Sequence, residues 1–234
     1  MSSTRPELYI NGRNRYAIRG EKGDMPRSGT ITKHIDAGDN FHLLKWAASL
    51  AVETGDPLAF QKNSQNAMDI GTDVHKEIED HISAVLDGVE PPFWQDNSML
   101  FQRWYSVMNE LVSEWIAAEY MTFHPKMRYG GTIDAIARID GAVTILDWKT
   151  TTEYTSTGNE KTFDNPKHAA QLGSYYACLK DDPYMENPTK AKVVYLYKDT
   201  GNIQIKNVNL DRALKVFEAC YSVYSQKGGL FINE

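Results

Sequence analysis

The feature that most constrains the fold is the Asp140-Gly141 pair, which separates two stretches with the alternating pattern of β-strands. A two-residue type I′ turn needs positive φ at both central residues, and Asp-Gly tolerates this. The pair therefore predicts a β-hairpin within residues 132–148. If these two residues form the whole loop, counting back along both strands places Asp134 directly opposite Asp147, on the same face of the hairpin.

Two opposed carboxylates repel each other unless a cation lies between them, so the register predicts a divalent-metal site at Asp134 and Asp147. Lys149 returns to the face of Asp147 because side chains alternate along a strand. It can neutralise the pair or stabilise charge in a reaction. Trp148 should point into the core and leave its carbonyl as a further oxygen ligand. These donors suit Mg²⁺ or Mn²⁺. The alternative is a structural Asp–Lys salt bridge.

His75 is a second candidate metal ligand, on a stretch with helical periodicity. Neutral imidazole can bind Mn²⁺ and is tolerated beside Mg²⁺, although a lone helical His is more often structural. Glu79 lies one turn later on the same face. It can either orient the imidazole ring or pair with a surface Lys.

Two further groups are candidates for the same site. Glu119 is expected to begin the strand before the hairpin, where its carboxylate is either a metal ligand or a solvated surface group. His168, Gln171 and Tyr175 share one face of a helix predicted over 166–180, and their polar atoms suit phosphate oxygens or base edges. The alternative is helix packing, with Tyr175 in the core.

Periodicity predicts an α/β core with a mixed central sheet flanked by helices, plus a helical N-terminal elaboration. We expect one domain over 1–234, with a hairpin and helices in 1–118 and the sheet core in 119–234. The predicted elements are a hairpin over 8–19 with Asn11-Gly12 as its turn, helices over 41–53, 72–86, 98–118, 166–180 and 211–226, and strands over 119–123, 132–139, 142–148, 191–197 and 203–208.

Charge and cysteine content narrow the class of protein. The net charge of −6 excludes a global polycation, but residues 1–35 carry seven Lys and Arg against three acidic residues. This basic segment is either a nucleic-acid contact or a solvated arm. Two cysteines, Cys178 and Cys220, cannot hold a four-cysteine iron–sulfur cluster or zinc site. We expect no membrane partner, and a cytosolic location by default.

These motifs together resemble the RecB-like branch of the PD-(D/E)XK nuclease superfamily. That branch includes phage exonucleases, the CRISPR-adaptation exonucleases and the mitochondrial genome maintenance exonuclease. The resemblance runs in ordered blocks over roughly residues 8–180 and includes Gly29-Thr-Ile-Thr32 and Trp46-Ala-Ala upstream. The motifs are Gly71…His75…Glu79, Gly131-x-x-Asp134, Asp147-Trp-Lys149 and Gln171-x-x-x-Tyr175.

The resemblance implies a restriction-endonuclease-like core and one or two Mg²⁺ or Mn²⁺ ions. It implies metal ligation by His75, Asp134, Asp147 and the Trp148 carbonyl, with Glu119 less securely transferred. Lys149 would be the catalytic lysine, and Gln171 and Tyr175 would lie near the DNA backbone. Several members hold an iron–sulfur cluster through four cysteines, which this chain lacks.

The function expected is a metal-dependent DNA exonuclease that acts on single-stranded or end-containing DNA and leaves a 5′-phosphate. The alternatives are a structure-selective DNA endonuclease and a non-catalytic DNA-binding or assembly subunit. A purely structural α/β domain would not explain why Asp134 and Asp147 are placed opposite each other, because two unpaired carboxylates in a sheet repel. By analogy we expect a phage or bacterial setting in replication, recombination or repair, with possible partners from those processes.

Overall fold

The structure is a computed structural model that describes residues 5–36, 41–93, 98–153 and 165–226. Its centre is a five-stranded sheet in the order β3-β4-β5-β6-β7. β5 and β6 are parallel, and the other neighbours are antiparallel. The strands are β3 (Glu114–His124), β4 (Tyr129–Ile139), β5 (Ala142–Thr151), β6 (Lys190–Tyr197) and β7 (Ile203–Val208).

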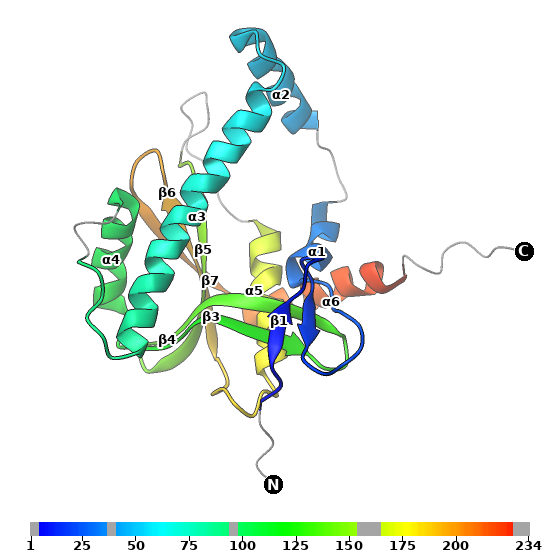
Figure 1. Ribbon diagram of the computed structural model, residues 1–234, viewed down its shortest axis with the longest axis vertical. Helices are drawn as coiled ribbons and strands as arrows, with labels where there is room; N and C mark the ends of the chain where they lie inside the picture. Colours follow the sequence, from blue (N-terminus) through cyan, green and yellow to red (C-terminus); the bar gives the residue numbers. More distant parts are fainter. Residues whose placement is uncertain (1–4, 37–40, 94–97, 154–164, 227–234) are drawn as a thin grey trace, which may run out of the picture.

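Helices cover both faces of this sheet, and a small hairpin lies against one end of it (Figure 1). The hairpin pairs β1 (Leu8–Ile10) with β2 (Tyr16–Ile18). The helices are α1 (Ser28–Thr32), continued by a 3-10 turn over Lys33–Asp36, α2 (Phe41–Thr54), α3 (Ala59–Leu86), α4 (Met99–Leu111), α5 (Pro166–Leu179) and α6 (Leu210–Gln226). The mixed sheet, its flanking helices and the helical N-terminal elaboration confirm the predicted fold class.

Side-chain alternation along the strands builds two cores. On one face Leu146 and Trp148 of β5 pack against α3 and α4, and Trp148 lies edge-on to Trp104 of α4. On the other face Val143 and Ile145 pack under α5. Because both faces of β5 are covered, its six consecutive residues from Val143 to Trp148 are buried.

Several sequence predictions are confirmed in detail. Asp140 and Gly141 have φ angles of 50° and 73° and form a two-residue turn, with Ile139 paired to Ala142. α5 begins at Pro166, and the side chain of the preceding Asn165 accepts a hydrogen bond from the Lys167 N–H. An N-cap of this kind satisfies a backbone donor that the helix cannot.

Other predicted boundaries are wrong. The helix predicted over 98–118 ends at Leu111, because Val112 is extended and β3 starts at Glu114. Trp115 fits the helical period, but β3 pairs with β4 from its first residue, which favours strand over helix. The helix predicted from residue 72 begins at Ala59 instead.

The N-terminal hairpin forms as predicted, but its turn does not. Ile10 pairs with Tyr16, so the loop spans 11–15 rather than Asn11-Gly12 alone. Asn14, at φ 56°, supplies the left-handed residue. The Asn11 side chain accepts hydrogen bonds from the Arg13 and Arg15 N–H groups and so organises the longer loop.

α2 and the first part of α3 extend away from the sheet as a helical arm, and the later part of α3 returns to the core (Figure 1). Trp46 of α2 and Phe60 of α3 make an edge-on ring contact that joins the two helices. Among the described helices, none combines the length and apolar content needed to cross a membrane.

The contact between α5 and α6 depends on Gly173, which yields the first testable prediction. A methyl group there would overlap the backbone of Ala213 and Leu214. We expect Gly173→Ala to lower the free energy of unfolding by about 1–3 kcal/mol, because a tight core must shift to admit it. Gly12→Ala is the control, since a methyl group there has no neighbour within 4 Å. Urea denaturation measures both, and equal stability of the two variants would contradict the prediction.

Candidate active site

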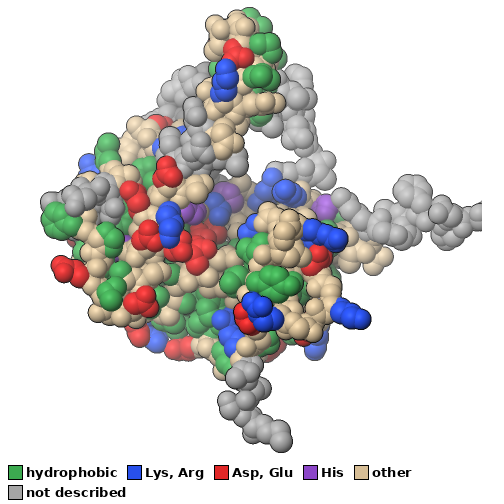
Figure 2. All heavy atoms as spheres, in the orientation of Figure 1, with side chains coloured by type: hydrophobic (Ala, Val, Ile, Leu, Met, Phe, Trp, Pro, Cys, Tyr) green, Lys and Arg blue, Asp and Glu red, His purple; other side chains and the backbone are tan. Residues whose placement is uncertain are grey.

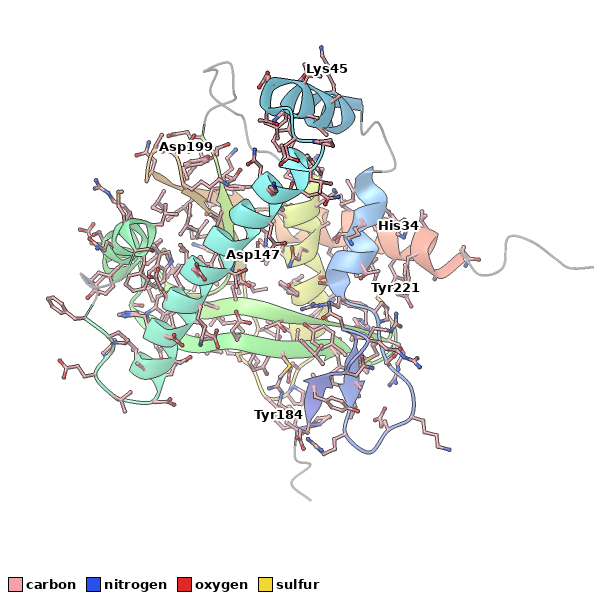
Figure 3. All side chains as sticks on the ribbon, turned by 45° about the horizontal axis from the view of Figure 1, so that its top comes forward. His34, Lys45, Asp147, Tyr184, Asp199 and Tyr221 are labelled. Carbon is pink, nitrogen blue, oxygen red and sulfur yellow. The ribbon has the colours of Figure 1, made fainter. Side chains whose placement is uncertain are left out.

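A cleft of about 1000 Å³ opens where the sheet forks. The pairing of β4 with β5 ends at Ala135 and Leu146. Beyond that point β4 stays paired with β3, and β5 stays paired with β6. The cleft is lined by the β1–β2 hairpin, α1, α3, β3, β4, β5 and α5. Figure 3 shows Asp147 in this region, between α3 and α5.

Asp134 and Asp147 are the first residues beyond the last β4–β5 pair, as the predicted register requires. The Trp148 N–H donates to Oδ2 of Asp134 at 2.7 Å. The Trp148 side chain is only 2% exposed and lies in the α3–α4 core, so this residue lines the cleft through its backbone. Because the N–H and C=O of one strand residue point to the same side, the Trp148 carbonyl also faces the Asp134 side.

Asp147 is completely buried, and its Oδ2 lies 2.6 Å from Nζ of Lys149. This confirms that the two side chains share a face. Apart from this ion pair, neither carboxylate oxygen of Asp147 has a hydrogen-bond partner among the described residues. A buried carboxylate without further donors is costly, because nothing replaces its hydration.

The protonation of this pair follows from its surroundings. Burial raises the pKa of Asp147 to about 6, with Lys149 opposing the shift and Asp134 adding to it. Burial also raises the pKa of Asp134. Burial lowers the pKa of Lys149, but the two carboxylates outweigh it, so its pKa lies above the usual value. Lys149 is therefore an ammonium at neutral pH and acts as a fixed positive charge rather than a base.

His75 reaches the same cleft from α3. Burial lowers its pKa first, and the nearby Lys149 charge lowers it further, while Asp147 opposes both. The imidazole is therefore neutral at neutral pH, which is the form that binds metals. Glu79 also lines the cleft, and its Oε2 lies 3.4 Å from Nζ of Lys76. Of the two predicted roles for Glu79, this contact supports pairing with a Lys.

Glu119 lies in the cleft but does not begin its strand as predicted. β3 starts five residues earlier, and a register irregularity between Trp115 and Ala117 precedes Glu119. Glu119 itself has φ 44°, an uncommon conformation for this residue type. Its side chain is exposed within the cleft, yet the walls exclude part of its water. This desolvation, followed by repulsion from Asp134 and Glu79, raises the pKa of Glu119 to about 7.

The helix face predicted on α5 is only partly in the cleft. Gln171 and Tyr175 line it, and the Gln171 amide donates to the Tyr175 hydroxyl at 2.7 Å. Tyr175 is buried and so is both core and cleft wall. His168 does not line the cleft; its Nδ1 lies 3.0 Å from the Tyr195 hydroxyl. Burial, together with Lys149 and Lys167, lowers the pKa of His168 to about 4.

One wall of the cleft comes from the N-terminal segment and was not predicted from the sequence. The hydroxyl groups of Tyr16 and Thr132 form a hydrogen bond of 2.6 Å, and both residues line the cleft. Arg27, Ser28 and Lys33 lie on the same side. The sequence contains two signals for this wall, the excess of basic residues in 1–35 and the Gly29-Thr-Ile-Thr32 block of the resemblance. Neither signal identifies Arg27 and Lys33 among the seven basic residues of this segment.

The donor set fits an oxygen-preferring divalent cation. Asp134, the buried Asp147 carboxylate and the Trp148 carbonyl are hard oxygen donors at the fork of the sheet, with neutral His75 close by. Among the described residues, however, no three His, Cys, Asp or Glu side chains are already grouped as a metal site. Asp134 accepts a hydrogen bond from the Trp148 N–H, and Asp147 is paired with Lys149. In this arrangement the Lys149 ammonium lies beside the Asp147 carboxylate, where a metal ion would otherwise supply the positive charge.

Comparison with known proteins identifies the family of the chain. Residues 1–221 match the PD-(D/E)XK nuclease superfamily. Since this match covers nearly the whole chain, the protein belongs to that superfamily, and the resemblance inferred from the motifs is confirmed. The cleft is accordingly a candidate nuclease site.

Individual relatives are similar over part of their length. Mitochondrial genome maintenance exonuclease 1 from Homo sapiens is 26% identical over 163 residues, which cover 68% of this chain and 45% of that protein. The Mus musculus protein is 25% identical over 164 residues, covering 68% and 46%. The chain thus spans about half the length of these curated relatives.

Two solved structures are similar in outline. The crystal structure of SSO0001 has a TM-score of 0.37 at 15% identity and covers 82% of each chain. The crystal structure of LHK-Exo in complex with dAMP has a TM-score of 0.40 at 13% identity and covers 87% of each chain.

Removing Lys149 should make the buried Asp147 carboxylate destabilise the fold, and the size of this effect should depend on pH. We expect Lys149→Met, measured with a chelator at pH 8, to lose about 3–5 kcal/mol of unfolding free energy. The folded pKa of Asp147 is already above its unfolded value, and loss of Lys149 raises it further. The penalty is therefore full above the folded pKa and declines as the pH falls towards the unfolded pKa.

The double variant Asp147→Asn with Lys149→Met is the control. It removes the unpaired charge, so it should be more stable than Lys149→Met at pH 8 and less dependent on pH. Chemical denaturation at pH 8 and pH 5 measures this. A Lys149→Met variant that loses the same stability at both pH values would show that the ion pair does not carry the effect.

Proposed function

We propose that this protein is a metal-dependent DNA exonuclease that hydrolyses phosphodiester bonds in single-stranded or end-containing DNA and leaves a 5′-phosphate. The observation that supports this most strongly is the buried Asp147 carboxylate, which pairs with Lys149 and is close to Asp134, behind the wall that Asp134 and Lys149 form in a large cleft of a PD-(D/E)XK nuclease. The related mitochondrial genome maintenance exonuclease 1 supports the exonuclease assignment by its name.

Each residue has a role that its surroundings allow. Asp134, Asp147 and the Trp148 carbonyl, with His75 as a nitrogen donor and Glu119 at the cleft wall, would hold Mg²⁺ or Mn²⁺. When bound, the metal lowers the pKa of a water molecule and screens the phosphate charge. Lys149 remains an ammonium because of the neighbouring carboxylates and stabilises the negative charge that develops on the phosphate oxygens.

The α5 residues fit a supporting role. The hydrogen bond from Gln171 to Tyr175 fixes both side chains at the cleft wall. Either polar group can contact a DNA phosphate or base edge. His168 packs on Tyr195 outside the cleft, so we assign it to holding α5 in position rather than to contacting DNA.

Metal dependence and residue roles can be tested together. We expect end-labelled single-stranded DNA to be degraded with Mg²⁺ or Mn²⁺ and left intact with a chelator. Asp147→Asn should nearly abolish turnover, because it removes a central oxygen donor. Lys149→Ala should retain DNA binding but lower kcat by at least roughly 100-fold. Lys22→Gln, an exposed change outside the cleft, is the control. Near-normal kcat in Lys149→Ala would overturn its catalytic role.

The exonuclease assignment is tested separately with two forms of the same sequence. We expect linear single-stranded DNA to be digested and covalently closed circular single-stranded DNA to survive, since an exonuclease needs a free end. Cleavage of the circle would instead identify a structure-selective endonuclease. Binding of both forms with no cleavage of either, under any metal, would favour a non-catalytic DNA-binding subunit.

A further inference from the structure

We propose that Arg27, Ser28 and Lys33 form a phosphate-binding subsite on the wall of the cleft opposite the acidic residues. The subsite would bind a DNA phosphate other than the one being cleaved and so position the strand. This inference rests on the proposed function, because it assigns a further contact for the same substrate.

The cleft carries opposite charges on its two sides. Acidic side chains gather on the α3 side of the hollow, and Lys and Arg side chains gather on the α1 side (Figure 2). Glu79, Glu119 and Asp134 line the first side, and Arg27 and Lys33 line the second. A strand that places one phosphate at the acidic side with its metal would present a neighbouring phosphate to the basic side.

Arg27 differs from Arg15 and Arg19 of the N-terminal segment because no ion pair neutralises it among the described residues. Arg15 pairs with Asp24, and Arg19 pairs with Glu7. Arg27 instead donates to Oδ1 of Asn14 at 2.7 Å, and its guanidinium lies 5.7 Å from the centre of the Tyr16 ring. Both partners are uncharged, so they orient the guanidinium and leave its positive charge available to an anion.

Backbone contacts fix the position of Arg27 next to β4, the strand that carries Asp134. Arg27 forms a parallel bridge with Gly130 of β4, and the Gly130 N–H donates to the Pro26 carbonyl at 3.0 Å. A methyl group on Gly130 would lie 2.6 Å from Cγ of Tyr16, so only glycine lets the hairpin approach this closely. Tyr16 then bonds to Thr132, which shares the face of Asp134 two residues later. Arg27 is therefore fixed relative to Asp134.

Ser28 adds a polar side chain to the same wall of the cleft. It is 2% exposed and lines the cleft next to Arg27. Serine hydroxyls at a cleft wall are common hydrogen-bond donors to DNA phosphate oxygens. The Ser28 hydroxyl would donate to a phosphate oxygen while the adjacent Arg27 guanidinium binds the same phosphate.

The bound phosphate is either an internal diester of the strand or the monoester at its 5′ end. Binding of two oligonucleotides that differ only at the 5′ end distinguishes these two cases. We would measure Kd by fluorescence anisotropy, with a chelator present, for 3′-labelled single-stranded oligonucleotides that carry either a 5′-phosphate or a 5′-hydroxyl. We expect Arg27→Gln to weaken binding about tenfold and Ser28→Ala to weaken it roughly threefold. The slope of log Kd against log salt concentration should also fall by about 0.7 for each phosphate that the variant no longer neutralises.

Arg13→Gln is the matched control, because Arg13 is exposed in the same N-terminal hairpin and does not line the cleft. Equal losses on both oligonucleotides would support an internal diester, and losses confined to the phosphorylated one would support a terminal phosphate. Unchanged Kd and salt slope in Arg27→Gln, or an equal loss in Arg13→Gln, would overturn the subsite.

Two measurements keep the conclusions separate. If thermal unfolding shows that Arg27→Gln does not fold, Ser28→Ala carries the test alone, and an unchanged Kd in that variant would overturn the proposal. Wild-type cleavage of linear DNA reports on the proposed function. A wild-type protein that binds through Arg27 but never cleaves would remove the nuclease proposal and leave the subsite standing.

Discussion

The ion pair between Asp147 and Lys149 is the interaction on which the candidate site depends. Asp147 is completely buried in the central strand of the sheet, and Lys149 supplies its one described counter-charge. This arrangement is possible because β4 and β5 separate after Ala135 and Leu146, which leaves backbone and carboxylate groups free of the sheet ladder. The fork thus supplies both the space for a cleft and the polar atoms that line it.

Much of the fold could be predicted because local chemistry and global arrangement agree. Asp140-Gly141 defines a turn by its backbone preference alone, and that turn fixes the register that brings Asp134 to Asp147. Asn165 and Pro166 mark the start of α5 for equally local reasons. The end of α4 was not predictable in this way, because Trp115 satisfies the helical period while sheet pairing determines its conformation.

The rest of the cleft escaped prediction because it depends on contacts between distant segments. Tyr16 meets Thr132 only because Gly130 has no side chain, and nothing near Tyr16 in the sequence signals this. Glu119 was expected near the site, but its positive φ and the irregular pairing before it come from the sheet. His168 shares the helix face of Gln171 and Tyr175, but its ring contacts the Tyr195 hydroxyl outside the cleft.

The two-residue turn between β4 and β5 also bears on the order in which the molecule assembles. Segments joined by short loops meet sooner than segments far apart in the chain, so this hairpin should form ahead of the parallel pairing of β5 with β6, which must wait for the long crossover through α5. Asp134 and Asp147 would then face each other while water still separates their charges. The helices that later cover the hairpin would then enclose a carboxylate that already has the ammonium of Lys149 beside it.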